Sequence, residues 1–98
     1  MGSVQDFLLK VVSSLRGDYT PSTLEAFPDL QRATPKTSVQ GGGGKRKRWK
    51  DKKGKIYEWD SQHGTVEVYN KRGKHLGEFD PKTGKQLKPA DKTRKVEP

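Results

Sequence analysis

The N-terminal segment places its hydrophobic residues at helical spacing. They recur at i, i+3, i+4, i+7 and i+8, and are Val4, Phe7, Leu8, Val11, Val12 and Leu15. This spacing predicts an amphipathic helix that starts near Ser3 and Asp6 and ends before Gly17. Its apolar stripe either binds a partner or covers hydrophobic surface of its own chain. The longest apolar run, residues 7–9, is far shorter than the roughly 20 residues that cross a bilayer, so we expect no stable membrane insertion.

A second, shorter helical turn is predicted to open at Thr20 and Pro21. Proline suits the first helical position, and Ser22 with Glu25 has the spacing of a capping box. Pro28 then stops regular helix. One side of this segment collects the apolar residues Leu24, Phe27 and Leu30.

From residue 45 onward, short alternating segments replace the helical spacing. Residues 55–60, 65–70, 74–79 and 85–88 are predicted strands, and 45–50 is a fifth candidate. Turns that end in glycine separate them, at residues 51–54, 70–73 and 80–84. Short sequential strands with short turns favour a small, twisted antiparallel sheet. The predicted fold class is therefore α+β, mostly β, with a short N-terminal helical segment.

The sheet has few apolar residues to bury, since only 28% of the 98 residues are hydrophobic and 34% are charged. The candidate core is Trp49, Ile56, Tyr57, Trp59, Val66, Val68, Leu76, Phe79 and Leu87. At about 2 kcal/mol per buried side chain, this set barely offsets the ordering of the chain. We expect a thin, one-sided core that gains stability from a bound partner.

Four consecutive glycines at residues 41–44 close a polar stretch that begins at residue 31. Such a run is typical of a flexible link. A phosphate-binding loop is disfavoured because Lys45 is followed by Arg46 rather than by Ser or Thr. We predict that residues 1–18 are an upstream helix or linker and that 19–98 form one domain. Within it, 19–44 are an entry segment with a hinge, and 45–98 form the sheet.

Positive charge is concentrated in the C-terminal half. Residues 1–44 carry four basic and four acidic side chains, whereas residues 45–98 carry 17 basic and eight acidic ones, which is the whole net charge of +9. Such a field attracts a polyanion: nucleic acid, an acidic protein or an anionic membrane. The alternative is a soluble basic surface without a partner.

One predicted hairpin brings acidic and imidazole groups together. Alternation along the strand at 65–70 sends two valines to the core and sends Glu67 and Tyr69 to the opposite, solvent-facing side. His63 lies four residues before Glu67, and Asp60 lies just before the turn. Two carboxylates and an imidazole therefore converge among many cations.

This set suits RNA cleavage without a metal or other cofactor. The ribose 2′-hydroxyl would attack the adjacent phosphorus, with Glu67 as the base and His63 as the acid for the leaving 5′-oxygen. Asp60 would fix the imidazole tautomer, and Lys88 and Arg94 would clamp the phosphate. No metal site is predicted, because cysteine is absent and neither the HExxH nor the zinc-finger spacing occurs.

A dense basic run offers further contacts for RNA. Phosphates would be held, and a base stacked, by Lys45, Arg46, Lys47, Arg48 and Trp49. Tyr69 offers another stacking surface, and His75 is either a substrate contact or a structural residue. The alternatives are a solvated charge run, a Trp49 that belongs to the core, and Glu67 and His63 without catalytic roles. The chain would then be a non-catalytic RNA- or ribosome-binding module, or a domain that binds an acidic protein.

The segments KRKRW, KIYEWDSQHG, VEVY and HLGEFDPKTGKQLK, behind a glycine-rich hinge, resemble the C-terminal cytotoxic domain of cloacin and the ribosome-cleaving colicins. The resemblance covers about residues 41–94 and extends upstream toward Tyr19. It implies a toxin endoribonuclease that cuts small-subunit ribosomal RNA in the decoding-site region. It implies catalytic or substrate roles for Asp60, His63, Glu67, Tyr69, His75, Lys88 and Arg94.

The resemblance also implies an acidic cognate immunity protein and release from a producer cell, with action in the cytoplasm of a target bacterium. The chain departs from the family pattern at three places. The turn at 70–73 is one residue shorter, Thr65 stands where an acidic residue is common, and the tail after Lys88 lacks a glycine and a basic aromatic finish. Arg94 is therefore matched through a gapped alignment.

Overall fold

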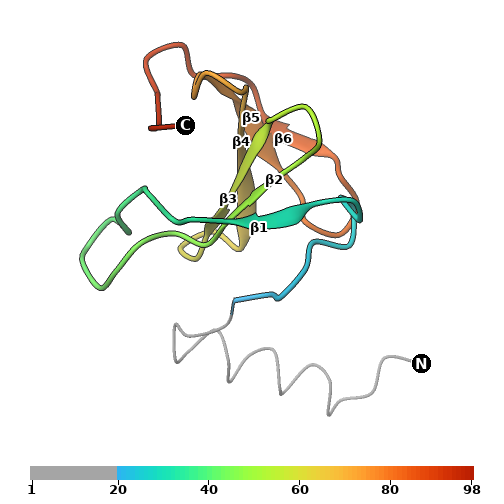
Figure 1. Ribbon diagram of the computed structural model, residues 1–98, viewed down its shortest axis with the longest axis horizontal. Helices are drawn as coiled ribbons and strands as arrows, with labels where there is room; N and C mark the ends of the chain where they lie inside the picture. Colours follow the sequence, from blue (N-terminus) through green and yellow to red (C-terminus); the bar gives the residue numbers. More distant parts are fainter. Residues whose placement is uncertain (1–19) are drawn as a thin grey trace.

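The computed structural model describes residues 20–98. They form one six-stranded sheet in which every strand pairs antiparallel with its neighbours in the sequence, in the order β1-β2-β3-β4-β5-β6 (Figure 1). The strands are β1 Gln31–Ala33, β2 Arg48–Lys50, β3 Ile56–Asp60, β4 Thr65–Tyr69, β5 His75–Phe79 and β6 Gln86–Lys88. The helix predicted at residues 4–15 lies outside the described residues. Within residues 20–98 no helix is long and apolar enough to cross a membrane.

The antiparallel sheet is confirmed, and four of the predicted strands agree with β3, β4, β5 and β6 to within one residue at each end. The fifth candidate, residues 45–50, is a strand only over β2, Arg48–Lys50. Strand β1 was not predicted, because Gln31–Ala33 contains no apolar alternation; it forms by pairing with β2, where Arg32 lies opposite Trp49. The helical turn predicted from Thr20 is wrong. Residues 20–30 form separate turns, because the backbone N–H of Ala26 donates to Pro81 across the molecule instead of continuing a helix.

The hydrophobic core lies on one face of the sheet. Apolar side chains of the entry segment pack against the core face; for example, the Phe27 ring centroid is 5.0 Å from that of Tyr57. The buried cluster is Leu24, Trp49, Tyr57, Trp59, Val66 and Val68, with Phe27, Leu30, Leu76 and Phe79 against it. Leu87, predicted to be in the core, is instead 45% exposed, because β6 is an edge strand that pairs only with β5.

The opposite face of the sheet is also covered, so the expectation that it faces solvent is wrong. Glu67 and Tyr69 are 3% and 1% exposed. A fully buried ion pair lies on this face: Arg48 Nη2 is 2.6 Å and Nε is 3.0 Å from Oε2 of its cross-strand partner Glu58. The same oxygen accepts from the Thr37 hydroxyl, and Arg48 Nη1 donates to the backbone carbonyl of Glu97.

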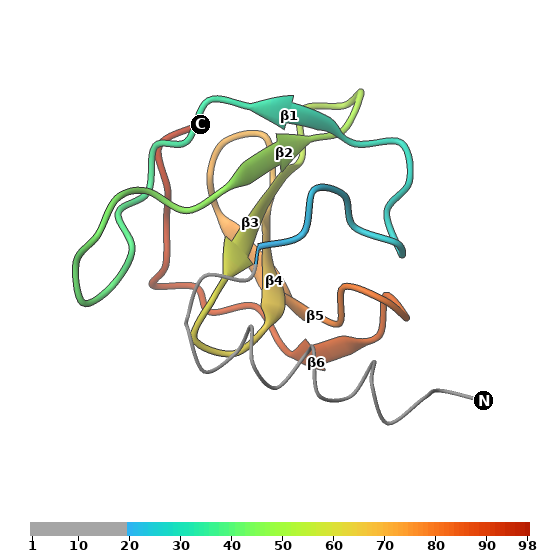
Figure 2. The same ribbon diagram turned by 90° about the horizontal axis from the view of Figure 1, so that it is seen from below.

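The segment after β6 accounts for part of this cover. We call residues 91–97 the tail. It returns to the turn between β4 and β5, where Lys74 and Lys95 form an antiparallel bridge and Val96 N donates to Gly73 O at 2.9 Å. Figure 2 shows the red C-terminal segment running back to the stretch that follows β1. Gly73 has φ +87°, and a Cβ built there would lie 2.0 Å from Val96 O, so the tail needs glycine at this position.

Candidate active site

The turn between β3 and β4 fixes the first pair of polar groups. Asp60 ends β3, and its Oδ1 accepts the backbone N–H groups of Gln62 (3.0 Å) and His63 (3.3 Å). The backbone N–H of Gly64 donates to Asp60 O and closes the turn. This folds the imidazole back so that His63 Nδ1 lies 2.7 Å from Asp60 Oδ2.

Each member of this pair shifts the pKa of the other. Burial raises the pKa of Asp60, but the hydrogen bond from His63 and the positive charge of Arg46 outweigh it, so the pKa lies below its usual value. The hydrogen bond to Asp60 and then its negative charge raise the pKa of His63. Asp60 is buried while the His63 side chain is 54% exposed, so an ionised carboxylate supports a protonatable ring that is open to solvent.

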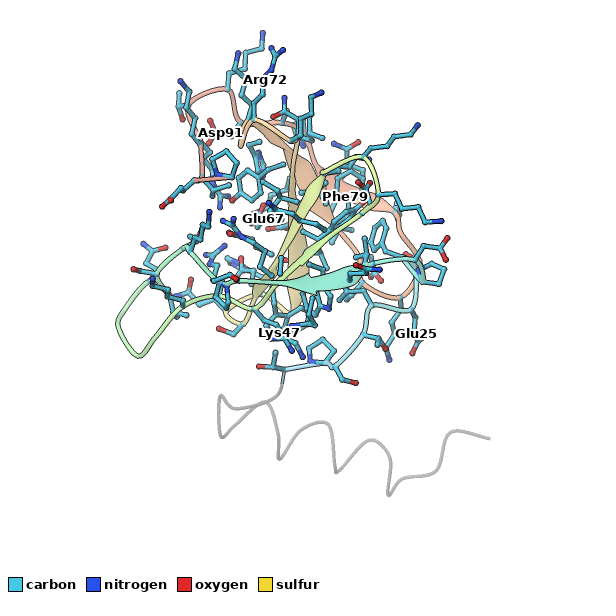
Figure 3. The ribbon with its side chains drawn as sticks, in the orientation of Figure 1. Glu25, Lys47, Glu67, Arg72, Phe79 and Asp91 are labelled. Carbon is cyan, nitrogen blue, oxygen red and sulfur yellow. The ribbon has the colours of Figure 1, made fainter. Side chains whose placement is uncertain are left out.

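Glu67, at the middle of β4, is the centre of a second group. Its Oε1 accepts from His75 Nε2 of β5 at 2.8 Å, and its Oε2 lies 3.3 Å from Arg94 Nη1 of the tail. Arg94 Nη2 donates to the Tyr69 hydroxyl at 3.0 Å. Figure 3 shows Glu67 near the centre of the molecule. A buried carboxylate is thus held by one imidazole and one guanidinium.

The hydrogen bonds of His75 assign its tautomer. Its Nδ1 accepts the backbone N–H of Asp91 at 2.8 Å and therefore carries no proton. The ring hydrogen is on Nε2 and is donated to Glu67. The tail consequently fixes Glu67 from both sides, through Arg94 directly and through Asp91 by way of His75.

Both groups face one cleft of about 370 Å³. Its walls come from β3, β4, β5, β6 and the tail, and it is lined by Gln40, Arg46, Asp60, Gln62, His63, Glu67, His75, Glu78, Lys88, Pro89, Asp91 and Arg94. Seven residues singled out from the sequence therefore meet: Arg46, Asp60, His63, Glu67, His75, Lys88 and Arg94.

Other predicted site residues lie elsewhere. Arg48 and Trp49 are 0% and 2% exposed, so the prediction that they contact substrate is wrong. Arg48 pairs with Glu58, and Trp49 lies in the core, which was the alternative for this residue. Tyr69 is too buried to stack on a base and instead supports Arg94. Lys45 and Lys47 line a neighbouring hollow of about 440 Å³ together with Arg46, which borders both.

Sequence reasoning missed two groups in the cleft. Glu78 lies directly opposite Glu67 in the pairing of β4 with β5. This pairing could not be predicted from the sequence alone, because the register shifts between Val68 and Tyr69. Asp91 acts through its backbone N–H, which leaves no signal in residue type. The carboxylate of Glu78 could have been suspected from the strand prediction, whereas the role of Asp91 required the path of the tail.

One subset of cleft residues has the spacing of metal ligands. One ligand atom from each of Asp60, His63 and Glu78 lies within 4.8 Å of the other two. No metal site was predicted, since these residues are scattered in the sequence. The cleft also holds the buried carboxylate of Glu67, the protonatable imidazole of His63 and the cations Arg46, Lys88 and Arg94. These are the groups needed to transfer protons beside a phosphodiester.

Comparisons with known proteins confirm the resemblance inferred from the motifs. A family model described as Cytotoxic matches residues 19–97. Cloacin and colicin E3 of Escherichia coli are each 54% identical over 85 residues, which is 81% of this chain and 15% of each relative. Colicin-E6 of the same organism is 50% identical over 93 residues, which is 89% of this chain and 17% of its own length. The chain thus spans less than one fifth of the length of these relatives, and it belongs to the Cytotoxic family.

Proposed function

We propose that this chain is a toxin endoribonuclease that cuts small-subunit ribosomal RNA in the decoding-site region and so halts translation. Membership of the Cytotoxic family and similarity to cloacin and colicin E3 support this proposal. The observation that carries it is the shared cleft, in which a buried carboxylate held by His75 and Arg94 faces the same space as the Asp60–His63 pair.

The proposed reaction is a transesterification that needs no metal ion. Glu67 removes the proton of the ribose 2′-hydroxyl, whose oxygen forms a bond to the adjacent phosphorus. The bond from phosphorus to the 5′-oxygen breaks, and the protonated His63 gives its proton to that oxygen. The products are a 2′,3′-cyclic phosphate and a 5′-hydroxyl. DNA is not a substrate, because it lacks the attacking hydroxyl.

The supporting groups have distinct tasks in this scheme. The Arg94 guanidinium touches Glu67 and can also reach a phosphoryl oxygen at the cleft, where positive charge stabilises the transition state. Lys88 and Arg46, which line the same cleft, bind the flanking phosphates. Asp60 favours the protonated form of His63, since its hydrogen bond and its negative charge raise the pKa of the ring.

The partners follow from charge and family. A net charge of +9 favours the ribosome as a polyanionic target and an acidic cognate immunity protein as an inhibitor, which electrostatic steering would bring to the cleft. We propose that the toxin is released from the producer cell and acts in the cytoplasm of the target bacterium, as the similarity to cloacin and the colicins suggests.

The test is cleavage of purified ribosomes in the presence of EDTA. The unmodified chain should release one discrete 3′ fragment of the small-subunit RNA. Glu67→Gln should lower the cleavage rate by about 10²–10⁴-fold, the range for a lost general base, while ribosome co-sedimentation stays nearly constant. Glu25→Gln, the same change at an exposed residue outside the cleft, is the matched control and should cleave normally.

Two outcomes would contradict the proposal. Intact RNA with undiminished binding of the unmodified chain would favour a non-catalytic ribosome-binding module. Normal cleavage by Glu67→Gln would remove the assigned base.

A further inference from the structure

Glu78 is a buried carboxylate in the cleft that the proposed reaction does not use. It is 6% exposed and lies directly opposite Glu67 on β5. Its neighbour across β6 is Lys88, yet none of the hydrogen bonds or ion pairs within residues 20–98 involves the Glu78 carboxylate. The side chain lines the cleft, where solvent reaches its oxygens and its negative charge acts on His63. Carboxylates in such surroundings are commonly paired or bound to metal, so a cation in the cleft would give this one a direct partner.

The geometry points to a divalent-cation site formed by Asp60, His63 and Glu78, with the ligand chemistry of Zn²⁺. The three ligand atoms lie within 4.8 Å of one another and come from the end of β3, the following turn and the next-to-last residue of β5. Imidazole nitrogen and carboxylate oxygen are both ligands that Zn²⁺ takes in proteins, and Zn²⁺ needs only three or four of them. Mg²⁺ is disfavoured because it requires near-octahedral oxygen coordination.

Small movements bring these atoms to coordination distance. Bonds of about 2.0–2.1 Å in a tetrahedral arrangement place ligand atoms about 3.3 Å apart. His63 Nδ1 and Asp60 Oδ2, now 2.7 Å apart, must separate slightly, and any pair of ligand atoms near the 4.8 Å limit must approach. The exposed His63 ring can make this adjustment.

The surroundings of Asp60 favour a metal ligand. Its Oδ1 is held by the backbone N–H groups of Gln62 and His63, which leaves Oδ2 directed into the cleft. Such outer-shell hydrogen bonds orient ligating carboxylates. The two carboxylates balance the charge of the cation, although Arg46 and Lys88 line the same cleft and oppose it.

Occupancy by Zn²⁺ has a consequence that rests on the proposed function. The metal replaces the hydrogen bond between Asp60 and His63 that favours the protonated ring, so His63 can no longer serve as the acid for the leaving group. Zn²⁺ is therefore an inhibitor of the ribonuclease, and a chelator restores its activity.

The binding test uses Zn²⁺ alone and the full chain. Isothermal titration should give one bound Zn²⁺ per chain, with shifted NMR signals for the His63 ring. Glu78→Gln should weaken binding by at least about tenfold, whereas the matched Glu25→Gln should not. His63→Ala removes an exposed ring and provides a second variant that should lose binding if Glu78→Gln fails to fold. No Zn²⁺ binding, or undiminished binding in both cleft variants, would overturn the site.

The cleavage test separates this site from the proposed function. Each variant is compared with and without Zn²⁺ relative to its own metal-free rate, and Zn²⁺ should inhibit the unmodified chain far more than Glu78→Gln. Binding without inhibition would leave the metal site standing and would contradict the catalytic roles of Asp60 and His63. Equal inhibition of both proteins would show that Zn²⁺ acts elsewhere and would overturn the inhibitory role of the site.

Discussion

Replacing Gly73 with alanine should release the tail from the sheet and remove Arg94 from the cleft. Gly73 ends the turn between β4 and β5 at φ +87°, and its carbonyl accepts the backbone N–H of Val96 at 2.9 Å. Two residues before Val96, Arg94 contacts Glu67 and Tyr69. The substitution therefore acts on the cleft through the backbone, without altering a side chain that faces it.

The size of the effect follows from the contact distances. A Cβ at Gly73 would lie 2.0 Å from Val96 O, so the tail must retreat by about 1.4 Å to reach an ordinary contact of 3.4 Å. The left-handed backbone adds about 1–2 kcal/mol for alanine. Two backbone hydrogen bonds hold the tail here, from Val96 N to Gly73 O and from His75 N to Arg94 O, and each contributes about 0.5–1.5 kcal/mol. Breaking them costs less than keeping the overlap between the new Cβ and the tail, so we expect the tail to detach. Loss of a transition-state charge contact lowers cleavage by about 10²–10³-fold.

The assay is a comparison of ribosome cleavage by Gly73→Ala, Arg94→Ala and the double variant. If alanine at position 73 acts through Arg94, the double variant should cleave no more slowly than Arg94→Ala alone. If the two substitutions instead lower the cleavage rate independently, so that their effects multiply in the double variant, Gly73 does not act through Arg94. Normal cleavage by Gly73→Ala would also refute the reasoning.

Gly54→Ala is the matched control. Gly54 also has φ +87° and ends a turn of the same length, but its Cβ would meet only the Cβ of Lys71 at 3.2 Å. The backbone strain is thus the same, while the tail is untouched. Its unfolding free energy should fall by about 1–2 kcal/mol with little change in cleavage.

Two further predictions concern the ionised groups. Asp60→Asn removes the negative charge and weakens the hydrogen bond that raise the pKa of His63. The fall in cleavage at high pH, where His63 loses its proton, should therefore move to lower pH. An unchanged high-pH side of the pH–rate profile, or an unchanged NMR titration of His63, would contradict this. Arg48→Met leaves the buried carboxylate of Glu58 without its positively charged partner and should lower the free energy of unfolding, measured in urea, by about 3–5 kcal/mol. A decrease below about 1 kcal/mol would contradict the importance of this ion pair.

The strands were predictable because their turns are encoded locally. Asp51 and Asn70 each begin a turn and accept two backbone N–H groups with Oδ1, at Lys53 and Lys55 in one case and at Arg72 and Lys74 in the other. These side-chain bonds fix the chain reversal whatever the rest of the fold does. Alternation between the turns then placed Val66 and Val68 on the apolar face correctly, although Ile56 is outside the core cluster and Leu87 is exposed.

The polar face was harder to predict, because its burial depends on contacts far apart in the sequence. Arg48 lies in a run of cations that looks solvated, yet Glu58 pairs with it across strands and the tail covers it. The grouping of Asp60, His63 and Glu67 follows from one hairpin, whereas the support from Arg94 requires the path of the tail. Local pattern therefore predicted the centre of the site but not what holds it in place.

The order of the strands has a consequence for how the molecule is made. Each strand pairs with the strand preceding it, and the loops from β2 onward are short, so this part of the sheet can assemble hairpin by hairpin. Such local contacts are associated with rapid folding. The cleft does not share this property. Its last members, Asp91 and Arg94, emerge from synthesis only after β6, and they must then dock onto a turn more than a dozen residues earlier. A nascent chain can thus acquire its sheet well before it becomes competent to attack RNA.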